Sequence, residues 1–174
     1  MLPAGRCTSR GVSGGTGGTR DAGYCPAMLR VPLHQLDDDL PVPAYARVGD
    51  AGVDLIARDG AVLTPQGGRA LVPTGVAVAI PPGHAGLVLP RSGLALRHGV
   101  TCLNTPGLID SGYRGELQVV LVNHDPEHAY TVARGDRIAQ LVVVRVEEVF
   151  FDLVPLDGLG EAERGIGGFG HTGT

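Results

Sequence analysis

Two short stretches of the sequence carry the groups best suited to phosphate chemistry. The first, PRSGLA at residues 90–95, ends an apolar run and combines the Arg91 guanidinium, the Ser92 hydroxyl and a glycine. Together with the backbone amides of the turn, these groups could converge on a phosphate. The alternative is that Arg91 pairs with a carboxylate of the protein itself.

The second stretch, GLIDSGYRGEL at residues 107–117, contains a candidate general base. Asp110 follows two apolar residues in a turn flanked by glycines. We expect partial burial of this carboxyl group, which would raise its affinity for a proton and so make it a usable base. The competing interpretation is that Asp110 only caps the turn.

The chain ends in RGIGGFGHTGT, residues 164–174, where Gly165, Gly167 and Gly170 have the G-x-G-x-x-G spacing. In dinucleotide-binding folds this spacing leads into a helix whose N-terminus holds a pyrophosphate. Here too few residues follow Gly170 to form a helix. A P-loop needs a lysine, whereas all 14 Lys and Arg positions are arginine. On composition alone, a disordered tail is the remaining interpretation.

Three other patterns have simpler interpretations. His124 and His128 have the spacing of a helical zinc pair, but Pro126 lies between them and argues against a helix. The acidic run 37–39 is interpreted as a solvated turn rather than a cation site. The RGD tripeptide at 134–136 is interpreted as a turn that leads into a strand.

Most of the chain around these stretches is typical of β-strands. The runs 75–80 and 85–90, joined by PPGH, predict a hairpin of about five residues per side. The runs 116–123 and 138–146 are apolar and β-branched. A single helical turn is expected after Ser92. These patterns predict an all-β fold, a barrel or a sandwich.

The composition limits the class of protein. A chain of 174 residues suggests one domain with a proper core. The formal charge of −4 offers no basic face for nucleic acid, and no apolar run reaches membrane-spanning length. Three cysteines without a C-x-x-C motif favour a reducing cytoplasm over a disulfide framework.

Residues 1–27 differ in composition and in apolar pattern from the rest of the sequence. They hold many glycines and almost no periodic apolar pattern, which is typical of a flexible extension. We expect Met28 to be the true start, with residues 1–27 either a translated upstream stretch or a dispensable arm.

Five stretches, taken in this order, resemble the five sequence motifs of the trimeric dUTPase family. They are DAGVDL (50–55), PRSGLA (90–95), NTPGLIDSGYRGE (104–116), RGDRIAQL (134–141) and RGIGGFG (164–170). The resemblance implies a jelly-roll-like β domain over residues 28–163, assembled as a homotrimer with shared active sites. It also implies Mg²⁺-dependent hydrolysis of dUTP to dUMP and pyrophosphate, which limits uracil incorporation into DNA.

The resemblance further implies a role for each matching residue. Asp110 would activate the water that attacks the α-phosphorus, Tyr113 would pack beneath the deoxyribose and exclude a 2′-hydroxyl, and Asp54 would bind magnesium through water. The phosphates would be held by Arg91, Ser92, Gly93 and Gln140, and the uracil by Asn104 and the backbone at Leu108 and Ile109. Residues 164–174 would form a flap in which Arg164 grips the terminal phosphate and Phe169 stacks on uracil.

Some positions leave alternatives open. Gln118 either lines the nucleoside pocket or faces outward from its strand. Val53, Leu108 and His171 depart from residues that are frequent in the family, although none of them removes a role-bearing group.

Two rival functions remain. One is a dCTP deaminase-type enzyme of the same fold, and the other is a catalytically silent regulatory module that binds dUTP.

Overall fold

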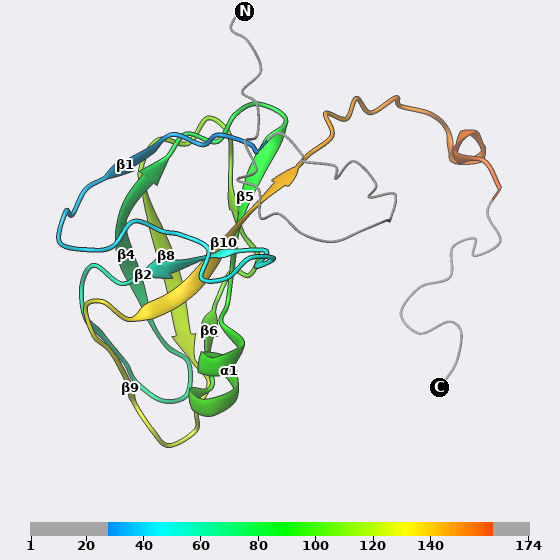
Figure 1. Ribbon diagram of the computed structural model, residues 1–174. Helices are drawn as coiled ribbons and strands as arrows, with labels where there is room; N and C mark the ends of the chain where they lie inside the picture. The colour runs from blue at the N-terminus through cyan, green and yellow to red at the C-terminus, as the bar shows by residue number, and fades with distance from the viewer. Residues whose placement is uncertain (1–27, 162–174) are drawn as a thin grey trace, which may run out of the picture. The chain divides into compact units, whose positions relative to one another are not determined.

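The computed structural model describes residues 28–161, and its compact body begins at Val31 (Figure 1). The predicted all-β class is confirmed. The strands are β1 Leu33–Gln35, β2 Val53–Ile56, β3 Ala61–Leu63, β4 Gly68–Val78, β5 His84–Leu89, β6 Val100–Cys102, β7 Gly107–Ile109, β8 Glu116–Asn123, β9 Tyr130–Val132 and β10 Arg137–Arg145. The helix α1 spans Ser92–His98, and a 3-10 helix, η1, spans Leu156–Leu159.

Two antiparallel sheets share one core. The first has the strand order β1-β4-β8-β6, the second has the order β2-β10-β5-β7, and β3 and β9 form a separate pair. Buried aliphatic side chains from both four-stranded sheets belong to a single cluster, for example Val72 and Leu121 from the first sheet and Leu55 and Ile138 from the second. The fold is therefore a sandwich in which alternate strand residues face the shared interior.

The predicted hairpin of residues 75–80 and 85–90 is wrong. Both runs are strands, but β4 pairs with β1 and β8, whereas β5 pairs with β10 and β7. The segment between them crosses from one sheet to the other and buries Ile80, which is 1% exposed, in the core. Burial of an apolar side chain in this connection outweighs the pairing that a tight turn would have allowed.

The helical turn expected after Ser92 is confirmed as α1. Leu94 is its buried residue, and Gly99 ends the helix in the left-handed conformation with φ 63°. A Cβ at Gly99 would lie 2.8 Å from the backbone nitrogen of Asp125, so this position requires glycine for both shape and space. The end of α1 is thereby held against the segment that follows β8, where the backbone N–H of His124 donates to the carbonyl of Gly99 at 2.9 Å.

No helix within residues 28–161 has the length and apolar character needed to cross a membrane. The extension 1–27 and the glycine-rich segment 164–174 lie outside the described residues.

Candidate functional site

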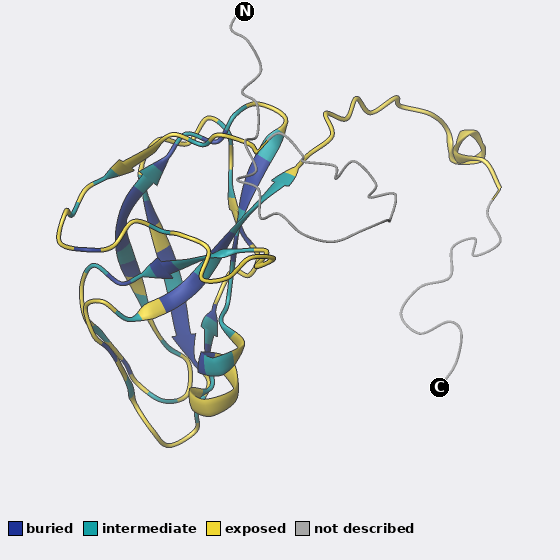
Figure 2. Ribbon diagram, viewed as in Figure 1, coloured by how far each residue is buried: buried dark blue, intermediate teal, exposed yellow. Residues whose placement is uncertain are grey.

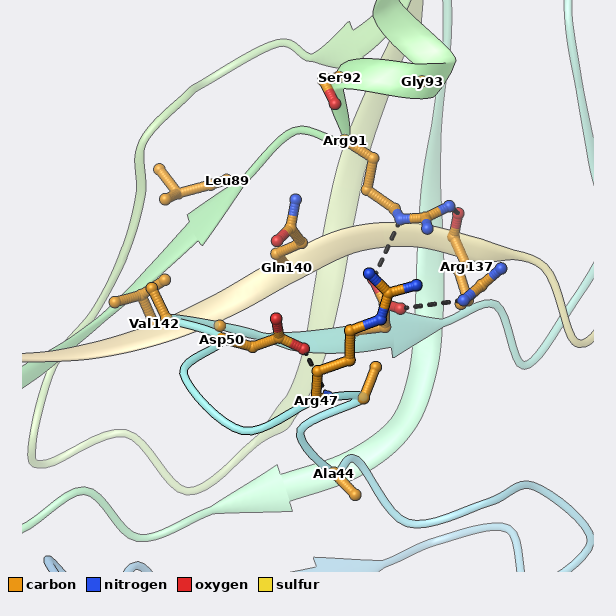
Figure 3. Close-up of a pocket in the computed structure, with 14 residues that line it drawn as sticks. Ala44, Arg47, Asp50, Leu89, Arg91, Ser92, Gly93, Arg137, Gln140 and Val142 are labelled. Carbon is orange, nitrogen blue, oxygen red and sulfur yellow. Dashed lines mark hydrogen bonds and ion pairs between the residues drawn. The ribbon is translucent and has the colours of Figure 1, made fainter.

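A pocket of about 470 Å³ lies where β2, β5 and β10 meet the start of α1 (Figure 3). Its walls include five of the residues singled out from the sequence, together with a second arginine: Asp54, Arg91, Ser92, Gly93, Gln140 and Arg137. The fold therefore brings together residues from three motifs that are as much as 86 positions apart in the chain.

Strand register explains why these side chains meet. Gln140 on β10 lies opposite Asp54 on β2 and opposite Leu89 on β5. Leu89 is the last residue of β5, so Arg91 follows just beyond it. Gln140 Nε2 also donates a 3.4 Å hydrogen bond to the carbonyl of Pro90, which ties the strand end to the centre of the sheet.

The charged groups of the pocket are paired with one another. The Nε atom of Arg91 lies 3.0 Å from Oδ1 of Asp54, and Nη1 of Arg137 lies 3.5 Å from Oδ2 of the same carboxylate. Arg91 Nη1 also donates to the carbonyl of Arg137 at 3.1 Å. The alternative that Arg91 pairs with a protein carboxylate is thus observed, yet a guanidinium has five N–H donors and keeps others for an anion.

The start of α1 adds further donors to the same wall. Ser92 and Gly93 are its first residues, and no side chain caps this end. The first amides of a helix have no partner within the helix, so they remain available to an anion. A Cβ at Gly93 would lie 3.0 Å from Nη2 of Arg97, which shows that a neighbouring guanidinium packs closely over this glycine.

Two arginines of the pocket were not singled out from the sequence. Arg137 belongs to the RGDRIAQL stretch, three positions before Gln140, and its proximity to that glutamine was the signal available. Arg47 also lines the pocket, and its backbone N–H donates to Oδ2 of Asp50 at 2.7 Å. No motif covers Arg47, so only the folded structure places it here.

A second group of predicted residues lies on and after β7. This strand pairs with β5 through Gly107 and Val88, Leu108 and Leu87, and Ile109 and Gly86. Since β7 is the last strand in its sheet order, one side of its backbone has no strand partner within residues 28–161. Its free N–H and C=O groups could hydrogen-bond a planar base.

The turn after β7 holds Asp110 and Tyr113. The backbone N–H of Tyr113 donates to the carbonyl of Asp110 at 3.1 Å. Arg114 Nη1 donates to the carbonyls of Ser111 and Tyr113 at 2.6 and 2.7 Å, which holds the turn closed. The tight turn predicted by the glycine-flanked stretch is therefore present.

The expected partial burial of Asp110 is wrong for this single chain, because the residue is exposed. It borders a hollow of about 330 Å³ together with His84, Ser111 and Glu148. No element among the described residues covers the turn, so nothing withdraws the carboxylate from water. Any burial of Asp110 has to come from outside this part of the chain.

Asp110 and Arg91 lie at opposite ends of β5. Asp110 follows Ile109, which pairs with Gly86 near the start of β5, whereas Arg91 lies beyond its end. Five residues of extended chain span roughly 15 Å. The backbones of the two residues are thus about one strand length apart, and their side chains border different hollows.

The remaining predicted residues fall into separate places. Asn104 is exposed and precedes β7, and its Nδ2 lies 3.5 Å from where a Cβ at Gly107 would stand. Gln118 is exposed on β8 opposite Pro73, as in the outward-facing alternative. Arg164 and Phe169 lie outside the described residues.

Within residues 28–161 no three His, Cys, Asp or Glu side chains cluster as a metal site. His128 Nδ1 lies 3.3 Å from Oδ1 of Asp125, and the backbone N–H groups of Glu127 and His128 lower the pKa of that aspartate.

Asp37 accepts hydrogen bonds from Arg134 at 2.5 and 2.9 Å. This bond to Arg134 lowers the pKa of Asp37 and raises that of Arg134.

The chain is thus an antiparallel β-sandwich with an arginine-lined pocket at a helix start and a carboxylate on a separate edge turn. The class of protein is all-β, with a site suited to an anionic ligand. The dUTPase family model matches residues 38–173 of this chain. The chain therefore belongs to the dUTPase family.

Individual relatives agree with this assignment. The deoxyuridine 5′-triphosphate nucleotidohydrolase of Thermobifida fusca (strain YX) is 54% identical over 145 residues, which cover 83% of this chain and 79% of the relative. The enzyme of the same name from Nocardia farcinica (strain IFM 10152) is 53% identical over 147 residues, covering 84% and 87%.

Solved structures show the same fold. The dUTPase of Staphylococcus bacteriophage 80alpha, solved with dUPNHPP, superposes with a TM-score of 0.75 at 29% identity, covering 83% of this chain and 99% of the other. A mutant dUTPase from phage phi11 of S. aureus, described with a structural Mg(II) ion, gives a TM-score of 0.68 at 26% identity, covering 74% and 99%.

Proposed function

We propose that this protein hydrolyses dUTP to dUMP and pyrophosphate. The observation that carries the proposal is the family match over residues 38–173, a range that includes every residue to which we assign a role. The relatives named above carry the corresponding enzyme name. The activity would lower the dUTP pool and so limit uracil incorporation into DNA.

The pocket beside α1 is proposed to hold the phosphates. A triphosphate has several negative charges, and binding it to a protein of formal charge −4 requires local positive groups. Arg91 and the first amides of α1, at Ser92 and Gly93, supply such groups, and Gln140 supplies a neutral donor. We add Arg137 to this set because its guanidinium lies in the same pocket.

Asp54 is proposed to bind Mg²⁺ through water. Mg²⁺ usually keeps several waters and is held by one or two carboxylates together with substrate phosphates. One accessible carboxylate beside the proposed phosphate site fits this demand, and a cluster of three protein ligands is not required. When bound, the ion would offset phosphate charge and favour the departure of pyrophosphate.

Asp110 is proposed to be the general base. Its carboxylate would accept a proton from a water molecule whose oxygen attacks the α-phosphorus. The bond from that phosphorus to the bridging oxygen of the β-phosphate would break, and pyrophosphate would leave with the bond electrons. The products are then dUMP and pyrophosphate, with both hydrogens of the water accounted for by the product oxygen and the base.

The β7 turn is proposed to select the nucleoside. The free edge of β7 at Leu108 and Ile109, with the Asn104 amide, can pair with the polar edge of uracil. In this arrangement the backbone would approach the base closely and leave no space for the methyl group that distinguishes thymine. Tyr113 would lie beneath the deoxyribose and block a 2′-hydroxyl.

We propose a homotrimer with shared active sites. The separation of Asp110 from Arg91 within one chain supports a site built from more than one subunit. After β10 the chain also exposes large apolar side chains, including Phe150 and Phe151 at 87% and Leu153 at 102% (Figure 2). Such exposure in an isolated chain is relieved when a partner covers it.

Residues 164–174 are proposed to close over the nucleotide. Arg164 would hold the terminal phosphate and Phe169 would stack on uracil, while the glycines allow backbone amides to approach closely. We place the enzyme in the cytoplasm, where Cys102, a free and buried thiol, suits a reducing compartment.

A product assay tests the proposal against its rivals. The full chain with Mg²⁺ should release one pyrophosphate per dUTP, release little from UTP or dCTP, and release no ammonia from dCTP. Ammonia from dCTP would indicate a deaminase. Tight dUTP binding without any pyrophosphate release would indicate a silent regulatory module, and either result would contradict the proposed function.

A further inference from the structure

The Tyr113 ring is positioned by the backbone of the two residues that precede and begin β8. Its hydroxyl donates a 2.9 Å hydrogen bond to the carbonyl of Glu116. A Cβ at Gly115 would lie 2.5 Å from that hydroxyl oxygen and 2.7 Å from Cζ, so the ring lies directly against the backbone there. Because Tyr113 is 43% exposed, this backbone rather than a surrounding core determines where the ring lies.

Glu116 is in turn held in a bulge of β4. Pairing with β8 passes from Pro73 opposite Gln118 to Ala77 opposite Glu116, so β4 has extra residues at this point. Gly75, inside the bulge, has φ 74° and its N–H donates to Oε1 of Glu116 at 2.8 Å. The Glu116 side chain therefore supplies an acceptor that the irregular ladder does not provide.

Arg58 completes the anchor from a third segment of the chain. Its Nη1 lies 3.1 Å from Oε1 of Glu116, and the two side chains are 30% and 13% exposed. The Arg58 backbone is fixed as well, because its N–H donates to Pro73 and its carbonyl accepts from Arg134. The Glu116 carboxylate thus joins a partly buried guanidinium and a backbone amide at one oxygen atom.

We infer that the Arg58–Glu116 ion pair positions Tyr113 and thereby contributes to sugar discrimination, an inference that rests on the proposed role of Tyr113 beneath the deoxyribose. Loss of the pair frees the start of β8 to shift, and the Glu116 carbonyl moves with it. The Tyr113 hydroxyl then loses its acceptor part of the time, and the ring leaves space for a 2′-hydroxyl. Arg58 and Glu116 are positioning residues, because they act through Tyr113.

The first test compares kcat/KM for dUTP and UTP in variants of the full chain. Arg58→Met should lower the dUTP preference about two- to fivefold, since the effect cannot exceed the free energy of one partly exposed ion pair. Glu116→Gln should have a similar or smaller effect, because it keeps an acceptor for Gly75. Asp59→Asn is the matched control: Asp59 is the other partner of Arg58, at 3.6 Å, and is 62% exposed.

A double-mutant cycle identifies the route of the effect. In a Tyr113→Phe background the hydroxyl donor is already absent, so Arg58→Met should cause no further loss of dUTP preference. Equal losses in the wild-type and Tyr113→Phe backgrounds would overturn the inference, because Arg58 would then act by another route.

A second readout does not depend on catalysis. The chain is labelled with 3-fluorotyrosine, and the fluorine resonance of Tyr113 is assigned by its absence in Tyr113→Phe. Arg58→Met should shift or broaden this resonance, while Asp59→Asn should leave it as in the wild type. An unchanged resonance together with an unchanged dUTP preference in both Arg58→Met and Glu116→Gln overturns the inference. A wild-type chain that releases no pyrophosphate from dUTP instead overturns the proposed function, whatever the resonance shows.

Discussion

Arg91 and Asp54 form an ion pair across the floor of the arginine-lined pocket, with 3.0 Å between Nε and Oδ1. The pair comes from two motifs, one on β2 and one just after β5, and Arg137 adds a longer contact to the same carboxylate. A nucleotide that binds here meets guanidinium groups already aligned by a protein carboxylate. Asp54 consequently has two proposed tasks, to orient the arginines and to hold hydrated Mg²⁺.

Asp54→Asn should separate these two tasks. We expect the Mg²⁺ concentration for half-maximal activity to rise about 10- to 100-fold, the scale for loss of a group that binds a metal through its waters. Binding of dUMP without metal should weaken far less, because Arg91 and Arg137 remain. Mg²⁺ titrations of activity, with calorimetric dUMP binding, measure both. Asp50→Asn is the control in the same pocket, and an unchanged Mg²⁺ requirement in Asp54→Asn would remove Asp54 from metal binding.

Arg137→Met should lower kcat/KM for dUTP by about tenfold, the effect expected for losing one hydrogen bond between charged groups. The aliphatic part of the side chain is retained, so the fold should persist. Arg145→Met, at the other end of β10, is the matched control and should leave kcat/KM unchanged. Steady-state kinetics of the two variants decide whether Arg137 contacts the phosphates.

Asp110→Asn should keep nucleotide binding and lower turnover by about 10²- to 10⁴-fold, the usual contribution of a positioned general base. Pyrophosphate release measures turnover, and calorimetry with a non-hydrolysable dUTP analogue measures binding. Ser111→Ala, in the same turn, should affect turnover much less. Near-normal turnover in Asp110→Asn would show that another group takes the proton.

The Asp37–Arg134 bond predicts a specific acid sensitivity. The pKa of Asp37 lies below its ordinary value of 3.8, chiefly because of the hydrogen bond to Arg134. A carboxyl group with a lowered folded-state pKa stabilises the fold above its unfolded pKa, and this contribution disappears as pH falls through the folded value.

Asp37→Asn should therefore melt at a lower temperature than the wild type at pH 7, and the difference should shrink as the pH falls below 3.8. Asp38→Asn, an exposed neighbour, is the control and should show no such trend. Calorimetric melting curves from pH 7 to pH 3 test this. A wild-type advantage that grows toward low pH would contradict the assigned direction.

The sequence predicts local structure well here because alternation and turn residues are local signals. The apolar runs that became β8 and β10, and the helical turn after Ser92, were identified in this way. The pairing of β4 and β5 was wrong because strand partners are chosen by long-range packing, which buries Ile80 between the sheets. Arg137 was missed although it lies in the RGDRIAQL motif, because its contact with Asp54 depends on the register of β10 with β2.

The exposure of Asp110 has a different origin. The sequence places this carboxylate in a glycine-flanked turn, but burial depends on what covers the turn. Nothing within residues 28–161 of a single chain does so. In the proposed trimer a neighbouring subunit would cover the turn, so the environment of Asp110 depends on the oligomer.

Rescue between two inactive proteins tests the shared site and the glycine-rich segment together. Asp110→Asn trimers lack the base, and trimers of a chain that ends before Arg164 lack the flap. If one site takes the Asp110 turn and the tail from different subunits, a mixed trimer can contain sites with an intact turn from the truncated chain and an intact tail from the Asp110→Asn chain.

With random 1:1 assembly each role is filled correctly about half of the time, so roughly a quarter of sites should be competent under closed three-fold symmetry. Co-refolding followed by a pyrophosphate assay measures this fraction, with mixed trimers verified by mass. Activity no greater than the sum of the two separate variants, in trimers that are shown to be mixed, would refute a site shared between subunits.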